Sequence, residues 1–298
     1  MALPLTEAVS TESSGIDLMP EAMVLARVLA GQNAAITAVE SAMAPIADAA
    51  GLMADVLRGG GRLIYAAAGS SALMAIADGL ELGGTFGIPP DRIMLLMAGG
   101  LPKDASMPGH TEDDARDAEI AAKGIGVGDL VIAVTASGAT PYPCVISRLA
   151  QAGGAQTIGI ANNAEAALFQ HSDVAIHLPT PPEVIAGSTR LAAATAQKAA
   201  LNMMSTLMGV HLGHVHDGMM VNLVADNAKL RARATGMVCR IAGVDAARAK
   251  ECLQVSGGAV KPAVMLAVGV ADLAQAMAKL DAEQGHLRNA LIKYGIYE

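Results

Sequence analysis

The chain has 298 residues, of which 53% are hydrophobic and only 2% aromatic, and it carries a net charge of −8. This length suffices for one large α/β domain with a small appendage. The acidic balance and the absence of any basic run argue against a nucleic acid or an anionic membrane as partner, because phosphate groups are bound by clustered lysine and arginine. Three widely separated cysteines favour a cytoplasmic location over a disulfide framework or a zinc site: Cys144, Cys239 and Cys252.

The N-terminal part of the chain is predicted to be an arm followed by helices. Residues 1–17 are rich in serine, threonine and glutamate, and they lack the basic and apolar halves of a signal peptide. Residues 19–58 show apolar side chains at helical spacing, so we expect residues 1–58 to form an arm and one or two helices. The most apolar long stretch, 191–210, contains polar side chains that favour a buried helix over a membrane span.

From residue 62 onward, short apolar runs alternate with helical patterns. We predict strands at residues 62–66, 92–97, 130–134, 156–160 and 174–178, and helices at 71–82, 113–123, 141–152 and 188–212. Strands that alternate with helices in this way form right-handed βαβ units. The predicted fold class is therefore α/β, a three-layer sandwich around a five-stranded parallel sheet, and ligands of such sheets bind at the carboxyl ends of the strands.

Three turns rich in glycine and hydroxyl residues fall at that edge of the predicted sheet. We name them the first nest (Gly69–Ser71), the second nest (Thr135–Pro141) and the third nest (Gly187–Arg190). Each precedes a helix, whose first N–H groups are unpaired and whose dipole favours an anion. A single turn of this kind is usually a plain helix cap, but three that converge indicate a site for phosphate or another anion.

The motif TASGATPY in the second nest, with the strand before it and the helix after it, resembles the sugar isomerase (SIS) fold, whose members bind phosphosugars in such turns. The similarity is closer to one branch, the bacterial N-acetylmuramic acid 6-phosphate etherases. It is carried by GGGRLIYAAAGSS, DGLELGGTFGIP, TEDDARD and the segment Pro182–Ala234, in the family's order. The resemblance implies an SIS phosphosugar-binding domain over residues 59–235 and a small helical C-terminal subdomain over 236–298.

The same resemblance implies a lyase that cleaves the 3-O-lactyl ether of a phosphorylated amino sugar, without cofactor or metal. It assigns Glu81 as the acid for the departing lactate and Glu112 as the base at C2, although the two roles could be exchanged. On the residues alone, Glu112 could simply open a helix, because it begins an acidic run. The substrate contacts implied are Gly69, Ser70, Ser71, Ser137, Gly138, Thr140, Glu183, Ser188, Thr189, Arg190 and Lys198.

Two arginines of the family pattern are missing from this chain. Leu73 and Ala139 stand in their places, while Arg190 and Lys198 remain as cations. The sequence therefore leaves the C3 substituent of the substrate open. Two other functions on the same fold also stay open: an aldose–ketose isomerase or deaminase, and a non-catalytic phosphosugar sensor similar to glucokinase regulatory protein.

Two clusters of reactive residue types have simpler interpretations. The spacing of His211, His214 and His216 beside Asp217 suggests a metal site, but the resemblance implies none, so we interpret them as surface or helix-end histidines. Cys144 is predicted to be a buried structural thiol rather than a nucleophile, because no histidine is placed beside it.

The tail contains an internal repeat. Residues 249–261 are echoed by residues 276–288, and each copy reads as a short helix, a glycine stop and the start of a second helix. Two copies predict a compact helical appendage. The apolar helices outside the sheet, together with the resemblance, predict a homodimer.

Overall fold

The computed structural model describes residues 5–107 and 109–297, so that the first four residues of the predicted arm lie outside it. The described residues form two compact units. The first unit contains the residues up to Gly79 together with Asp91–Ser205, and the second contains Leu80–Pro90 together with the residues from Thr206 onward. The boundaries expected from the sequence, after residues 58 and 235, remain predictions.

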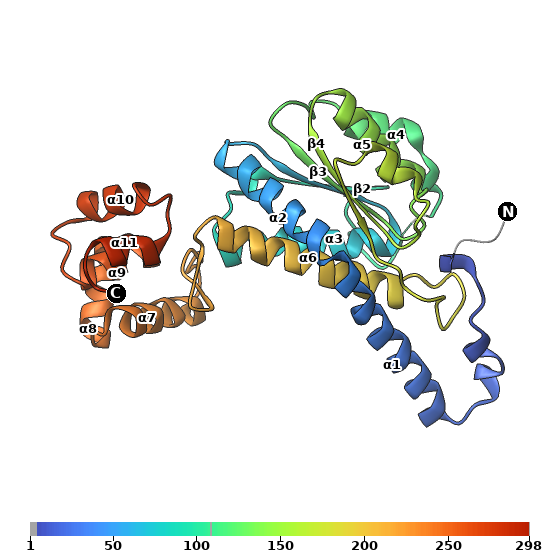
Figure 1. Cartoon of the computed structure of the whole chain (residues 1–298), viewed down its shortest axis with the longest axis horizontal. Coiled ribbons are helices and arrows are strands. Elements are labelled where there is room, and N and C mark those ends of the chain that lie inside the picture. Colours follow the sequence, from blue (N-terminus) through green and yellow to red (C-terminus); the bar gives the residue numbers. More distant parts are fainter. Residues whose placement is uncertain (1–4, 108, 298) are drawn as a thin grey trace. The chain divides into compact units, whose positions relative to one another are not determined.

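A parallel sheet is the centre of the first unit (Figure 1). Its strands are β1 (Leu63–Ala67), β2 (Ile93–Met97), β3 (Leu130–Thr135), β4 (Gln156–Ala161) and β5 (Val174–His177), in the order β2-β1-β3-β4-β5. All four strand pairs are parallel. The five predicted strands are confirmed, each end to within one residue, because buried strands of a parallel sheet read as continuous apolar runs.

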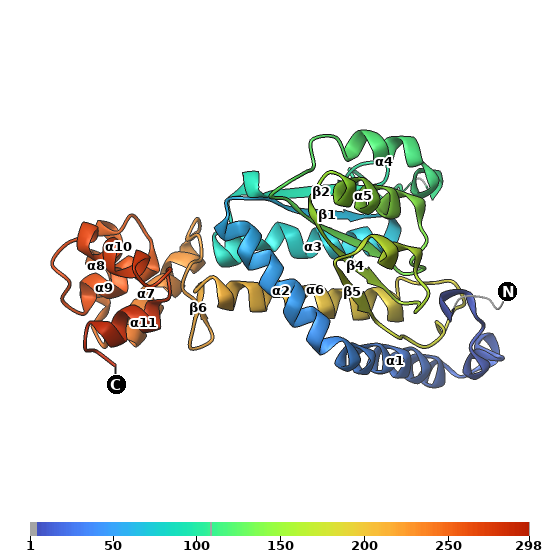
Figure 2. The same ribbon diagram turned by 45° about the horizontal axis from the view of Figure 1, so that its top comes forward.

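Helices cover both faces of this sheet (Figures 1 and 2). Ile64 and Val131 belong to a core cluster on the face covered by α4 (Ala115–Ala121) and α5 (Pro141–Ala152). Successive side chains of a strand point to opposite faces, and Tyr65 accordingly contacts α3 (Gly69–Phe86) on the other face. That face is also covered by α2 (Met43–Arg58), which packs on β1, β3 and β5. The predicted three-layer sandwich is therefore confirmed.

Local capping explains where the helices differ from the sequence prediction. Helix α5 has the predicted bounds, whereas α4 is shorter than predicted because the Asp114 side chain accepts a hydrogen bond from the Asp117 N–H and starts the helix there. The preceding residues form a 3₁₀ helix, η6 (Gly109–Asp113). Helix α6 (Ala192–His211) begins four residues later than predicted, after the third nest.

The N-terminal residues of the described chain form three short 3₁₀ turns, η1 (Leu5–Glu7), η2 (Thr11–Ser13) and η3 (Ile16–Leu18), followed by α1 (Glu21–Ala38). Helix α1 continues through the 3₁₀ helix η4 (Val39–Ala42) into α2. By length and composition, the helical segment Glu21–Arg58 is apolar enough to cross a membrane. Its second half packs on the sheet, but in α1 only Ala35 is buried, and Leu25 and Leu29 are 69% and 60% exposed. Helix α1 therefore presents an uncovered apolar surface.

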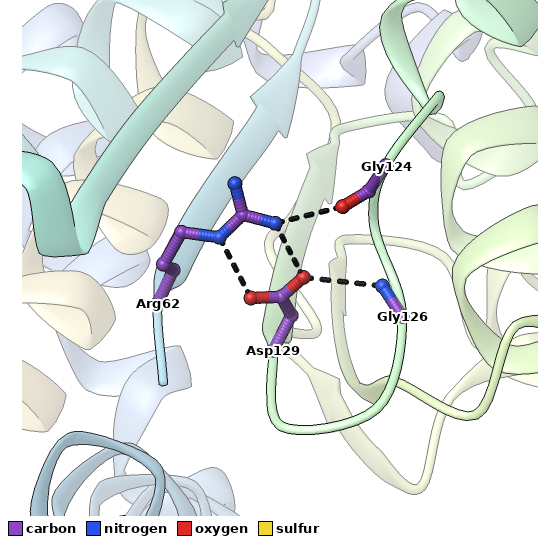
Figure 3. Close-up of polar contacts among 4 residues, drawn as sticks. All are labelled: Arg62, Gly124, Gly126 and Asp129. Carbon is purple, nitrogen blue, oxygen red and sulfur yellow. Dashed lines mark hydrogen bonds and ion pairs between the residues drawn. The ribbon is translucent and has the colours of Figure 1, made fainter. Parts of the chain in front are cut away.

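An ion pair joins the amino ends of β1 and β3 (Figure 3). The Arg62 guanidinium donates through Nε and Nη2 to the two carboxylate oxygens of Asp129, at 2.8 and 2.7 Å, and Nη2 also donates to the Gly124 carbonyl. The Gly126 N–H donates to Asp129 as well. Hydrogen bonding to Arg62 lowers the pKa of Asp129. This bidentate pair fixes the neighbouring strands β1 and β3 at the end of the sheet opposite to the nests.

Asp129→Asn is expected to destabilise the protein by about 1–2 kcal/mol at neutral pH, since one charge-assisted, partly buried pair is lost. The pKa of Asp129 is depressed in the folded state, so its stabilisation is present above about pH 4 and is lost as the pH falls through the folded pKa. Urea unfolding at several pH values checks this. A difference between variant and wild type that grows on acidification would contradict it.

The second unit contains the five helices of the described tail and a short hairpin. They are α7 (Ala228–Ala242), α8 (Ala246–Val255), α9 (Val260–Ala267), α10 (Leu273–Asp281) and α11 (Leu287–Lys293). The predicted repeat is confirmed. Residues that correspond in the two copies are buried alike, Ala249 with Ala276 and Val260 with Leu287. The corresponding Gly258 and Gly285 both have positive φ, at 92° and 79°, and stop the first helix of each copy.

The interpretation of all three tail histidines as surface or helix-end residues is wrong for His216. His211 is the last residue of α6, but His216 lies in β6 (Val215–His216), which pairs with β7 (Met219–Met220), and it is only 3% exposed. Its ring stacks on Tyr297, and burial lowers its pKa. Two-residue strands carry no periodicity, so the sequence pattern could not reveal this hairpin.

Candidate functional site

The second nest is a cluster of three hydroxyls at the carboxyl end of β3. Thr135 Oγ1 lies 2.8 Å from Thr140 Oγ1 and 3.3 Å from Ser137 Oγ, and Ser137 and Thr140 are 3.2 Å apart. The Gly138 N–H donates to Thr135 Oγ1, and the Ala139 N–H donates to Ser137 Oγ. Gly138 adopts a φ of +77°. Pro141 then opens α5, whose N-terminus carries unpaired N–H groups. The turn thus gathers hydrogen-bond donors suited to a phosphate.

The first and third nests meet each other. Ser70, in the first turn of α3, and Thr189, just before α6, have their hydroxyl oxygens 3.4 Å apart. Gly69 and Gly187 both adopt positive φ, at 54° and 72°. The structure therefore brings Ser70 and Thr189 together as the sequence predicts, whereas Ser71 is buried, at 4% exposure.

Glu112 lies against the first nest. A Cβ atom built on Gly69 would be 2.6 Å from Glu112 Oε1, which explains why a glycine stands at this position. Glu112 belongs to η6 and is half-buried. Burial, and then the charge of Asp113, raise the pKa of the Glu112 carboxyl above its usual value. A carboxyl with a raised pKa at the edge of a parallel sheet is a candidate for proton transfer.

A pocket of about 310 Å³ opens beside this carboxylate. Gly69, Thr111 and Glu112 form one side of it, and the end of β2 with the segment that follows, residues 97–104, 106 and 107, forms the other. That segment places Lys103 on the pocket wall. The pocket therefore combines a candidate base, a hydroxyl and a cation in a space large enough for part of a sugar.

Glu183 has a structural role in addition to the one the sequence suggests. It is 2% exposed, and its two carboxylate oxygens accept hydrogen bonds from the N–H groups of Ala192 and Ala193, at 2.8 and 2.9 Å. Burial raises its pKa, and the two hydrogen bonds oppose this rise. Glu183 thus caps α6 and fixes the start of that helix beside the third nest.

The other residues predicted to contact the substrate differ in their exposure and in the element that carries them. Arg190 is the last residue of the third nest and is exposed, and Lys198 is exposed on α6. Ser188 is half-buried within the third nest. Glu81 is exposed on α3, in the part of that helix that belongs to the second unit, so its pairing with Glu112 stays a prediction.

Cys144 is half-buried in α5, and its thiol donates to the Gly138 carbonyl at 3.7 Å. Burial raises the pKa of the Cys144 thiol to about 11, so the reactive thiolate is scarce at neutral pH. This agrees with the structural role expected from the sequence. Across residues 5–107 and 109–297, no three histidine, cysteine, aspartate or glutamate side chains are grouped so as to hold a metal ion.

Sequence reasoning missed two hydrogen-bonded polar side chains of the first unit, one of them in its core and one beside the second nest. Asp78 is 4% exposed and accepts hydrogen bonds from Tyr65, Asn202 and Ser205, at 2.8 to 2.9 Å. Burial raises its pKa, although the three donors and Lys198 lower it. A single aspartate within the apolar run of α3 was the available signal. The second group is Asn163. Its position just after a predicted strand was the only sequence feature that could have indicated a place at the edge of the sheet.

Matches to two family models, both described as the SIS domain, cover residues 30–162 and 110–219. Together with the parallel sheet and the nests at its carboxyl edge, they define the chain as an SIS-domain protein.

Curated relatives assign the chain to a narrower group. An N-acetylmuramic acid 6-phosphate etherase from Deinococcus radiodurans is 39% identical over 289 residues, covering 96% of this chain and 94% of the relative. Proteins of the same name from Streptomyces avermitilis and Symbiobacterium thermophilum are 37% and 40% identical, covering 96% and 88% of this chain and 93% and 87% of the relatives. The chain belongs to the N-acetylmuramic acid 6-phosphate etherase family, as the sequence motifs predict.

Proposed function

We propose that the protein is a carbon–oxygen lyase that converts N-acetylmuramic acid 6-phosphate to N-acetylglucosamine 6-phosphate and D-lactate. The family membership supports this reaction, and the observation that carries it is the position of Glu112, which touches the first nest and has a raised pKa. The substrate is a cell-wall sugar derivative, so the reaction belongs to amino-sugar catabolism and peptidoglycan recycling. The three reduced cysteines support a cytoplasmic location.

The reaction follows from the acidity of C2 in the ring-opened sugar. Glu112 removes the C2 proton beside the aldehyde, the C3–O bond breaks, and the lactate alkoxide takes a proton from Glu81. Water then adds to the C2–C3 double bond, placing a hydroxyl on C3 and a proton on C2. The second nest holds the phosphate throughout, so that its contribution to binding is shared by the substrate and the transition state.

Incubation with N-acetylmuramic acid 6-phosphate in ¹⁸O-labelled water tests this assignment. We expect equimolar D-lactate and N-acetylglucosamine 6-phosphate. The label should enter the sugar, and the hydroxyl oxygen of lactate, which was the ether oxygen of the substrate, should stay unlabelled. Release of labelled lactate would overturn the elimination. Aldose–ketose interconversion without lactate release would favour an isomerase, and binding without turnover would favour a sensor.

The pH profile tests Glu112 as the base. Its carboxyl must be ionised to accept a proton, so kcat/KM should rise with pH through the raised pKa of Glu112. Asp113→Asn removes a like charge that contributes to this rise, and the acidic limb should move to lower pH. Glu119→Gln, which removes an exposed charge from α4, is the control. An acidic limb that stays in place in Asp113→Asn would exclude Glu112 as the titrating base.

We also propose that a second copy of the chain covers α1, forming a homodimer. Met23, Leu25, Leu29 and Ile36 expose 48% to 69% of their surface along this helix, an apolar surface unusual for a free monomer. Light scattering should give twice the monomer mass of 30.1 kDa. The double change Leu25→Glu and Leu29→Glu should give monomers, whereas Val127→Glu, at a loop residue that is already 90% exposed, should not. A monomeric wild type would refute the dimer.

A further inference from the structure

The N-terminal arm docks beside the second nest through one residue, Asn163. The Leu5 N–H donates to Asn163 Oδ1 at 3.1 Å, and Asn163 Nδ2 lies 3.1 Å from Thr6 Oγ1. Thr6 is only 4% exposed, although Leu5 is 48% exposed and Glu7 is exposed too. A buried threonine in an otherwise exposed turn marks Thr6 as the point where the arm is anchored.

The same amide group of Asn163 holds the backbone of the second nest. Nδ2 also donates to the carbonyl oxygens of Ser137, at 3.0 Å, and Ala136, at 3.4 Å. Asn163 thus holds the backbone of the second nest together with the Asn162 N–H, which also donates to the Ala136 carbonyl. In this conformation the Gly138 N–H donates to Thr135 Oγ1, and the three hydroxyls of the nest keep the positions from which they can donate to an anion.

The arm reaches the third nest as well. A Cβ atom built on Gly187 would lie 3.4 Å from Glu7 Oε2, so the next arm residue after Thr6 lies over that turn. A carboxylate repels phosphate and accepts hydrogen bonds from sugar hydroxyls. This contact favours the second nest over the third as the site of the substrate phosphate.

We propose that Asn163 and Thr6 are positioning residues for the phosphate-binding turn, and that docking of the N-terminal arm is coupled to phosphosugar binding. This inference rests on the proposed function, since it takes the second nest as the phosphate site. Two of the three acceptors of Asn163 Nδ2 belong to the second nest and the third belongs to the arm. A change in the position of either the nest or the arm therefore alters the hydrogen bonds of Asn163. Coupling is reciprocal: if the docked arm favours binding, bound phosphosugar stabilises the docked arm.

Kinetics and calorimetry on the full-length chain test the positioning role. Thr6→Val keeps the shape of the side chain but removes the acceptor. The net loss of one such hydrogen bond corresponds to about a 3- to 10-fold increase in KM and in the Kd for N-acetylglucosamine 6-phosphate, with kcat little changed. Asn163→Ala should raise both constants further, by about 10- to 100-fold. Thr6→Ser restores the hydroxyl and should behave like the wild type.

Thr11→Val makes the same chemical change elsewhere in the arm and should leave KM and Kd unchanged. The inference is overturned if Thr6→Val binds as the wild type does, or if it lowers kcat or the melting temperature while KM stays the same. A wild type that binds the sugar phosphate but releases no lactate would instead overturn the proposed reaction and leave the coupling measurable by calorimetry.

Hydrogen exchange supplies an independent measure that does not depend on turnover. Saturation with N-acetylglucosamine 6-phosphate should slow amide exchange at residues 5–8 in the wild type and in Thr6→Ser. In Thr6→Val the same saturation should leave these amides almost as fast as in the free protein. Equal exchange rates in the free and saturated wild type would contradict the coupling.

Discussion

Glu112→Gln is expected to lower kcat by about 100- to 10,000-fold while KM changes little, because the amide keeps the shape of the side chain but cannot accept the C2 proton. Steady-state release of D-lactate measures both constants. The folded state should survive, since Glu112 is only half-buried. The variant should also bind N-acetylglucosamine 6-phosphate as the wild type does, which separates chemistry from binding.

Glu81→Gln should give a loss of similar size if Glu81 protonates the departing lactate. An exposed glutamate outside the site, Glu119 on α4, provides the matched control, and Glu119→Gln should keep full activity. Lactate release at the wild-type rate by both Glu112→Gln and Glu81→Gln would remove the carboxylate pair from the mechanism. A loss in Glu112→Gln alone would confirm the base and leave the acid to be found.

Gly138→Ala is expected to raise KM by about 10- to 100-fold, since a non-glycine residue at positive φ is strained by about 1–3 kcal/mol. Space is also lacking, because a Cβ atom at Gly138 would lie 2.2 Å from the Cβ of Ala166. The second nest must therefore open, which withdraws donors from the phosphate. Calorimetric titration with N-acetylglucosamine 6-phosphate measures the same loss as a weaker Kd.

Gly124→Ala separates strain from function. Gly124 also has a positive φ, of 81°, but nothing lies within 4 Å of an added Cβ, and it is at the opposite end of the sheet from the nests. This variant should melt at a lower temperature and keep its KM. If Gly138→Ala kept the wild-type KM and Kd, the second nest would not be the phosphate site.

The strands and most helices were predictable because their signals are local. Runs such as 130–134 are fully buried in a parallel sheet, and they are apolar for that reason. Pro141 and Gly153 frame α5, whose predicted bounds are those observed. The second nest was also predictable as a unit, since its three hydroxyls lie within six residues of the chain.

Contacts between residues that are far apart in the chain could not be predicted from the sequence pattern. Nothing in the spacing of Thr6 and Asn163, which are 157 residues apart, indicates that they are hydrogen-bonded. The sequence identified Glu183 as a candidate substrate contact, but its role as a helix cap depends on how the chain returns to the start of α6. The register of Asp78 against Asn202 and Ser205 likewise arises only when α3 and α6 pack together.

The two ends of the sheet in the first unit differ in their tolerance of change. Arg62 and Asp129 hold β1 and β3 together at the amino end, where no nest lies. The side chains at the carboxyl edge therefore do not need to fix the strand register. Leu73 and Ala139 are both exposed at that edge. A substitution at either of these two positions is therefore expected to leave the fold intact. The ion pair at the amino end would keep the strand register while side chains beside the nests change.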